Sequence, residues 1–258
     1  MTPDPAFRRA TLSVFILIGA LALVHAARAL LSPGADLELV FDYGFVPARL
    51  TAAFDPDGVR AAIAAQANAV GGANAFATYL IDGAPALHTL ATYALLHANL
   101  AHLAVNAVWL AAFGSAVARR FGALRFAAFC IVSALLGALA HLATHPYGAV
   151  VVIGASAIVS GAMGAAARFA FAPGAPLGGD FEQQGSVAPY RGPRTSIADV
   201  FRNRRALTFV AAWFATNLIF AVAAPGPGLG ENNVAWQAHI GGFLAGFLGI
   251  ALFEPRRA

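Results

Sequence analysis

The sequence predicts an all-α fold: a polytopic membrane protein with six transmembrane helices and both termini in the cytoplasm. Three observations carry this prediction. Of the 258 residues, 59% are hydrophobic and only 11% are charged, which is far from the composition of a soluble domain. The apolar residues fall in long runs. The arginines gather beside alternate connections between these runs, as the positive-inside rule requires of cytoplasmic segments.

Six apolar runs are long enough to cross the hydrocarbon core, which takes about 20 residues of helix. The first run is too long for a signal peptide and lacks a convincing cleavage site, so we expect it to be retained as a span. The six runs are Thr11–Leu31, Leu95–Ala118, Phe126–Thr144, Tyr147–Ala172, Leu207–Ala224 and Val234–Phe253.

The orientation of the spans follows from arginine alone, because the chain has no lysine. Thirteen of the sixteen arginines lie before the first run, between the second and third, in or beside the connection of the fourth and fifth, or after the sixth. We therefore expect these segments in the cytoplasm. The net charge of +4 reflects this topology, and we expect no nucleic-acid partner.

Residues 1–258 are expected to form a single membrane domain without internal repeats. The large outer connection, about residues 32–94, contains an apolar stretch, Val59–Leu80, that predicts one or two interfacial helices. It must be held by packing or by the membrane, because Cys130 is the single cysteine and no disulfide can form within the chain. The cytoplasmic connection, about residues 173–206, is rich in Gly, Pro, Gln and Arg and predicts a flexible linker.

Polar side chains inside the spans are costly in a bilayer and mark function. The informative ones are His97, His102 and Asn106 in the second run, Ser156 in the fourth and His239 in the sixth. These three runs cross the membrane in the same direction. At about 1.5 Å per residue, the side chains other than His97 lie about 8 to 17 Å below the outer surface. This shared layer predicts a site.

The chemistry of these side chains fits nucleophilic catalysis. Nucleophilic catalysis requires at least a hydroxyl beside an imidazole. Neutral His239 would take the proton as Ser156 attacks and would then return it to the leaving amine. His102 and Asn106 are four residues apart and therefore project from one helix face. Together with the backbone N–H of Ser156, they are candidate donors for the oxyanion.

Small residues predict how the two helices meet. Gly242 and Gly246 form a GxxxG pattern, which lets another helix backbone come close. Ser156 is itself flanked by small residues, among them Gly154 and Ala157. A close approach of the fourth and sixth runs would bring Ser156 to the base.

Simpler interpretations hold for the other polar residues. A lone serine in a membrane helix usually bonds back to a carbonyl one turn earlier, and GxxxG patterns are common. His25, His141 and His145 lie near span ends and are interpreted as local hydrogen-bonding residues, whereas His88 is ambiguous. Ser160 is a rival nucleophile that we consider unfavourable, because it lies about 6 Å deeper than the first serine.

Three segments together resemble the signatures of the rhomboid family. Leu96–Asn106 resembles the span-two signature, in which a His and an Asn four residues later line the oxyanion hole. Gly154-Ala155-Ser156-Ala157 resembles the GxSG stretch that carries the nucleophile. Ala238–Gly246 resembles the AHxxGxxxG helix that carries the base. The three segments occur in the family's order along the chain.

The resemblance implies an intramembrane serine endopeptidase with a dyad of Ser156 and His239, an oxyanion hole of His102 and Asn106, and no cofactor. Its partners would be the lipid bilayer and membrane proteins, which are cut in or near a transmembrane segment. The connection Ala223–Asn232 would be a cap over the site and the fifth run a lateral gate. The abundance of Ala and Arg indicates a bacterial inner membrane, with the site facing the periplasm.

The sequence departs from the family pattern at two points, and three other functions are alternatives to the protease. Ala157 stands where the family usually has glycine, and the outer connection has no tryptophan. The chain is alternatively an inactive relative that binds membrane clients. A metal-dependent protein would use His97, His102 and His239, but there is no HExxH motif and no carboxylate inside a span, so we expect no metal. A transporter would need the inverted repeat that we do not find. The oligomeric state stays open.

Overall fold

The computed structural model describes residues 5–70, 85–172, 174–175, 192–223 and 235–255. Within these ranges the chain is helical without strands, and one isolated bridge joins Phe45 to Val152. The all-α prediction is therefore confirmed. The elements are α1 Pro5–Arg28, α2 Pro33–Tyr43, α3 Pro47–Thr51, α4 Pro56–Val70, α6 Thr89–Thr92, the 3₁₀ turn η1 Tyr93–Leu95, α7 Leu100–Trp109, the π-helical turn η2 Leu110–Gly114, α8 Ser115–Phe121, α9 Ala123–Thr144, α10 Ser156–Ala167, α11 Ile197–Arg202, α12 Arg204–Ala223 and α13 Trp236–Phe253.

Four helical segments in the described ranges are long and apolar enough to cross a membrane. They correspond to the first, second, third and sixth predicted runs. Helix α12 covers the fifth run, and the fourth contains only the short apolar helix α10. The count of six spans stays a prediction. The four segments are Arg8–Arg28, Leu100–Phe121, Ala123–Thr144 and Trp236–Phe253.

The fourth run differs from the prediction of a helix over Tyr147–Ala172, since α10 covers only Ser156–Ala167. Extended backbone leads into it: Val152 and Phe45 exchange two hydrogen bonds of 2.8 and 3.0 Å. Residues 150–153 are Val-Val-Val-Ile, and β-branched side chains favour extended backbone over helix. An apolar run alone does not distinguish the two.

The second run also begins later than predicted. Asn99 caps α7, its Oδ1 accepting the backbone N–H of His102 at 2.9 Å. His97 therefore lies in the loop before the helix and not inside the span. From Leu100 the helix continues through the π-helical turn to Phe121.

Two predicted connections contain more helix than expected. The outer connection holds α2, α3, α4 and the short helix α6. Helix α4 includes the beginning of the predicted interfacial stretch, whose remainder lies outside the described residues. The composition of the connection between the fourth and fifth runs predicts a flexible linker, but α11 forms near its end. Ser196 caps α11, because its Oγ accepts the backbone N–H of Asp199 at 3.1 Å.

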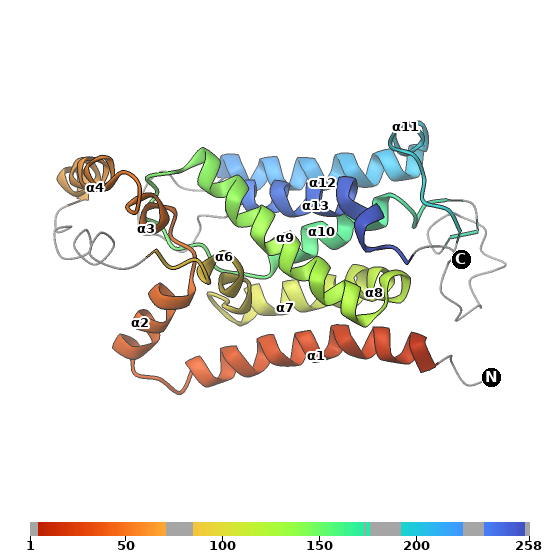
Figure 1. Ribbon diagram of the computed structural model, residues 1–258, viewed down its shortest axis with the longest axis horizontal. Coiled ribbons are helices and arrows are strands. Elements are labelled where there is room, and N and C mark those ends of the chain that lie inside the picture. The colour runs from red at the N-terminus through yellow and green to blue at the C-terminus, as the bar shows by residue number, and fades with distance from the viewer. Residues whose placement is uncertain (1–4, 71–84, 173, 176–191, 224–234, 256–258) are drawn as a thin grey trace.

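The helices run mainly along one axis, with different connections at the two ends (Figure 1). Helices α2, α3 and α4 gather at one end. The start of α1, the end of α13 and α11 lie at the opposite end. Helix α1 therefore begins, and helix α13 ends, at the same end of the bundle. Which side faces the cytoplasm stays a prediction.

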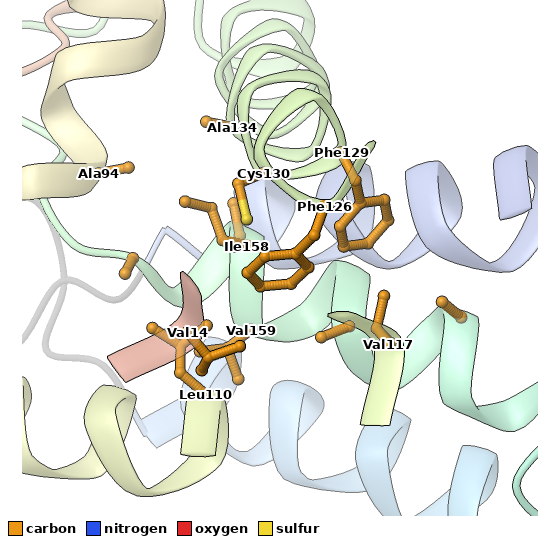
Figure 2. Close-up of a cluster of buried hydrophobic side chains, with 14 of the residues drawn as sticks. Val14, Ala94, Leu110, Val117, Phe126, Phe129, Cys130, Ala134, Ile158 and Val159 are labelled. Atoms are coloured by element: carbon orange, nitrogen blue, oxygen red, sulfur yellow. The ribbon is translucent and has the colours of Figure 1, made fainter. Parts of the chain in front are cut away.

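The main hydrophobic cluster fills the space between α1, η2, α8, α9 and α10 (Figure 2). Val14 of α1 and Leu110 of η2 meet Val159 of α10, while Phe126 and Phe129 of α9 close the cluster from above in this view. Burial of aromatic and aliphatic side chains in this cluster positions α10 among α1, η2, α8 and α9. The helix that carries Ser156 is therefore held on several sides.

The outer connection is tied to the bundle by polar contacts. Arg28 at the end of α1 forms an ion pair with Asp36 of α2 at 2.7 Å and donates to the carbonyl of His97 at 2.8 Å. Tyr147 donates its hydroxyl to Asp55 at 2.7 Å, and this hydrogen bond lowers the pKa of that carboxyl below its ordinary 3.8. These contacts fix the loop next to the residues that precede α7 and α10.

Candidate active site

Ser156 is the first residue of α10 and directly follows the extended segment. Its side chain is half-buried, whereas Ser160, the rival nucleophile, is 4% exposed and lies within the packed helix. A residue at a helix start has a backbone N–H without an intrahelical partner, so this N–H is available to an anion. The structure thus separates the two serines by accessibility.

The backbone before Ser156 is fixed from both sides. The N–H of Gly154 donates to the carbonyl of Tyr93 at 3.0 Å, and the N–H of Ala155 donates to Nε2 of His97 at 3.4 Å. His97 is completely buried. It therefore supports the backbone of the site, while Tyr93, which the sequence did not single out, anchors the same turn through its carbonyl.

Gly154 is required by its conformation and by its surroundings. Its φ is +125°, a region that L side chains rarely adopt. A Cβ at this position would lie 2.7 Å from Nε2 of His102 and 3.8 Å from Oγ of Ser156. The ring of His102 and the hydroxyl of Ser156 therefore face the same small space above this glycine.

The contacts of His102 identify its tautomer. The backbone N–H of Ala98 points at Nδ1 of His102, with an N···N distance of 3.5 Å. Because a backbone N–H only donates, Nδ1 is the acceptor nitrogen. The proton of the neutral ring is then on Nε2, which together with Cε1 forms the edge of the ring that faces the space above Gly154. This gives the space a side-chain donor.

Asn106 lies one turn further along α7 and is 3% exposed. Its Nδ2 donates to the carbonyl of His102 at 2.9 Å. That bond uses one of the two amide hydrogens. The predicted pairing of His102 and Asn106 on one helix face is therefore present, with the second amide hydrogen left for another acceptor.

Helices α10 and α13 approach until their backbones touch. A Cβ on Gly242 would collide with the carbonyl of Ala157, and one on Gly246 would collide with the carbonyl of Gly161. The GxxxG pattern predicted this contact. Since Ser156 precedes Ala157 and His239 lies one turn before Gly242, the crossing places the two candidate catalytic residues at the same level of adjoining helices.

The methyl group of Ala157 points toward α9. A Cβ at Gly137 of α9 would lie 2.6 Å from Cβ of Ala157, so the missing side chain at Gly137 makes room for this methyl. Ala157 itself is completely buried. The alanine that replaces the usual glycine is thus accommodated by a neighbouring helix.

His239 has a partner that the sequence did not indicate. Its Nδ1 lies 2.7 Å from Oδ1 of Asn217 in α12. Asn217 is 5% exposed. The two residues lie on different helices, so no sequence spacing relates them and only the structure shows that they are in contact.

The remaining histidines lie apart from these side chains, and Nδ1 of His25 is buried without a hydrogen-bond partner among the described residues. His141 lies 3.3 Å from Oε1 of Gln237 and stacks on His145, and Nε2 of His88 lies 2.8 Å from the carbonyl of Asp42. In the described part of the chain, no group of three or more His, Cys, Asp or Glu is arranged to hold a metal ion. The predicted cap, Ala223–Asn232, lies almost entirely outside the described residues.

Comparison with known proteins assigns most of this architecture to one family. The family described as Rhomboid domain matches residues 84–256, which is more than half of the chain and includes α6 to α13. None of the curated proteins compared matches the chain.

Proposed function

We propose that this chain, which belongs to the rhomboid family, is an intramembrane serine endopeptidase that hydrolyses peptide bonds in or near the transmembrane segments of membrane proteins. One observation carries the proposal. A half-buried serine begins a helix whose backbone touches the helix of His239, and the ring of His102 faces the same space. The family supplies the substrate class, and the apolar helices supply the setting in the bilayer.

The proposed reaction begins at the dyad. Nε2 of His239 accepts the proton of Ser156 as Oγ attacks the scissile carbonyl, and the imidazolium then gives that proton to the leaving amine. The C–N bond breaks and an acyl-enzyme remains. Water, deprotonated by the same imidazole, releases the acid product and regenerates the serine. A positioned general base of this kind contributes about 10²–10⁴-fold to the rate.

Three donors are available for the oxyanion. They are Nε2–H of His102, the second amide hydrogen of Asn106 and the backbone N–H of Ser156 at the start of α10. The positive end of the α10 dipole adds to their effect. Each donor in such a site is worth about 10²–10³-fold in kcat. No carboxylate is needed in this scheme.

The setting of the site completes the proposal. Ser156 begins α10 directly after the extended segment that pairs with Phe45, between α2 and α3. We assign the end of the bundle that carries α2, α3 and α4 to the periplasmic side of a bacterial inner membrane (Figure 1). The arginine distribution supports this orientation. Helix α12, at the side of α13, would be the lateral gate for a substrate helix.

Cleavage of single-span substrates in liposomes tests the proposal. We expect the Ser156→Ala and His239→Ala proteins to lose at least about a thousand-fold in kcat, as other serine enzymes do. Ser160→Ala is the matched control and should cut at close to the native rate. Native-rate cleavage by the Ser156→Ala protein would contradict the proposal. If the native chain cuts no member of a broad panel and binds a transmembrane client, an inactive client-binding relative explains the fold better.

A further inference from the structure

Helices α12 and α13 contact each other in two successive layers. Trp213 and Phe243 stack with ring centroids 4.2 Å apart and an interplanar angle of 24°. One turn away, Asn217 meets His239 at 2.7 Å. Each pair combines a residue of α12 with one of α13 at antiparallel register, so the aromatic stack holds the two helices where the polar pair forms.

The orientation of the Asn217 amide is fixed by its second contact. Its Nδ2 donates to the carbonyl of Trp213 at 2.8 Å. A carbonyl only accepts, so the NH₂ group must face Trp213 and the amide oxygen must face His239. An amide oxygen also only accepts. The ring atom beside it, Nδ1 of His239, must therefore carry the proton, and Nε2 of the neutral ring does not.

From this geometry we propose that Asn217 is a positioning residue for the base, a role that rests on the proposed function. By accepting the proton of Nδ1, it holds His239 in the tautomer whose Nε2 can take the proton of Ser156. Neutral imidazole in the other tautomer has no lone pair on Nε2 and does not act as a base there. Asn217 is buried, so water does not compete strongly for the bond.

The position of α12 is thereby linked to the state of the base. Trp213 and Asn217 are on the same helix, one turn apart, and both contacts depend on α12 lying against α13. If α12 moves away to admit a substrate helix, the bond to His239 breaks. The base is then fixed in its active tautomer only when α12 has returned.

Substitutions at Asn217 separate this role from a structural one. We expect Asn217→Leu, which keeps the approximate side-chain volume, to lower kcat by at least about tenfold, a part of the roughly 10²–10⁴-fold that a positioned general base contributes, with little change in KM. Asn217→Asp keeps an acceptor for Nδ1–H and should retain more of the activity. Thr216→Val is the matched control: this exposed neighbour bonds back to the carbonyl of Ala212 at 2.9 Å and makes no contact with the base.

Side-chain ¹⁵N NMR of histidine-labelled full-length protein reports the tautomer directly, with the signal of His239 assigned from the His239→Gln protein. Native protein should show Nδ1–H at neutral pH without substrate, and Asn217→Leu should shift the population toward Nε2–H. A native signal from Nε2–H would overturn the inference even if Asn217→Leu fails to fold. A folded Asn217→Leu protein with native kcat or an unchanged tautomer would also overturn it. Because this measurement needs no cleavage, it remains decisive if the protein cuts no tested substrate.

Discussion

Hydrogen-bond partners assign opposite tautomers to the two imidazoles of the site. The backbone N–H of Ala98 donates to Nδ1 of His102, which leaves the proton on Nε2. Asn217 accepts from Nδ1 of His239, which leaves Nε2 unprotonated. Nε2 of His102 is therefore a hydrogen-bond donor, and Nε2 of His239 is an acceptor. A charged third residue is unnecessary for this distinction, in agreement with the absence of carboxylates from the predicted spans.

Ala157 provides a test at the scale of a single methyl group. The Ala157→Gly protein should cut at a rate within about a factor of two of native, since the methyl faces Gly137 and lies away from the reacting atoms. Its unfolding free energy should fall by about 1 kcal/mol, because glycine is a poor helix former. Parallel cleavage and unfolding measurements check both. A several-fold gain in kcat would mean that alanine does crowd the site and that the native chain is a catalytically weak member of the family.

Residue motifs in the sequence indicated Ser156, His239, His102 and Asn106, because their types and spacings are those of a hydrolytic site. The sequence could not indicate Asn217, whose relation to His239 depends on the packing of two separate helices. The sequence predicts His97 inside a span, because the apolar run begins before the first residue of α7. In the structure it supports Ala155 from a loop.

At the scale of elements, α10 and α13 are held together by backbone contact through glycine. Substitution of Gly242 by alanine places a methyl group against the carbonyl of Ala157. We expect Gly242→Ala to cost about 1–3 kcal/mol of unfolding free energy and to reduce cleavage, because the crossing also aligns Ser156 with His239. Unfolding in mixed micelles measures the first effect.

Gly249 of the same helix is the matched control for this substitution. The nearest atom to a Cβ placed there is Cδ1 of Leu252, at 3.9 Å. Gly249→Ala should therefore leave stability and cleavage close to native, or stabilise α13 slightly. Equal losses for the two substitutions would show that the general flexibility of α13, and not its contact with α10, determines stability.

In the fourth apolar run, the sequence predicts a helix in the right place but with the wrong first residue. Its length predicts a complete span, but the β-branched residues before Gly154 are extended, and Val152 among them pairs with Phe45. The pairing partner lies in the outer connection, far away in sequence. The local sequence shows that this run is apolar, but the pairing of Val152 with Phe45 determines that the helix begins only at Ser156.

At the scale of the whole molecule, the two ends of the bundle should lie on opposite sides of the membrane. Ala53, between α3 and α4, and Ala198, in α11, are both exposed and lie at opposite ends. In intact cells, Ala53→Cys should react with a membrane-impermeant maleimide, whereas Ala198→Cys should react only after permeabilisation. The native Cys130 is buried and gives a low background. The reverse pattern would contradict the orientation inferred from arginine placement.

The identity of the nucleophile is the central claim, and a serine-directed fluorophosphonate probe tests it most directly. Peptide mapping of the labelled native protein should locate the adduct on Ser156, and the His239→Ala protein should lose it. Ser160→Ala should label like native protein, since that serine is buried. An adduct on Ser160, or labelling of Ser156 that does not depend on His239, would contradict the assignment of the dyad.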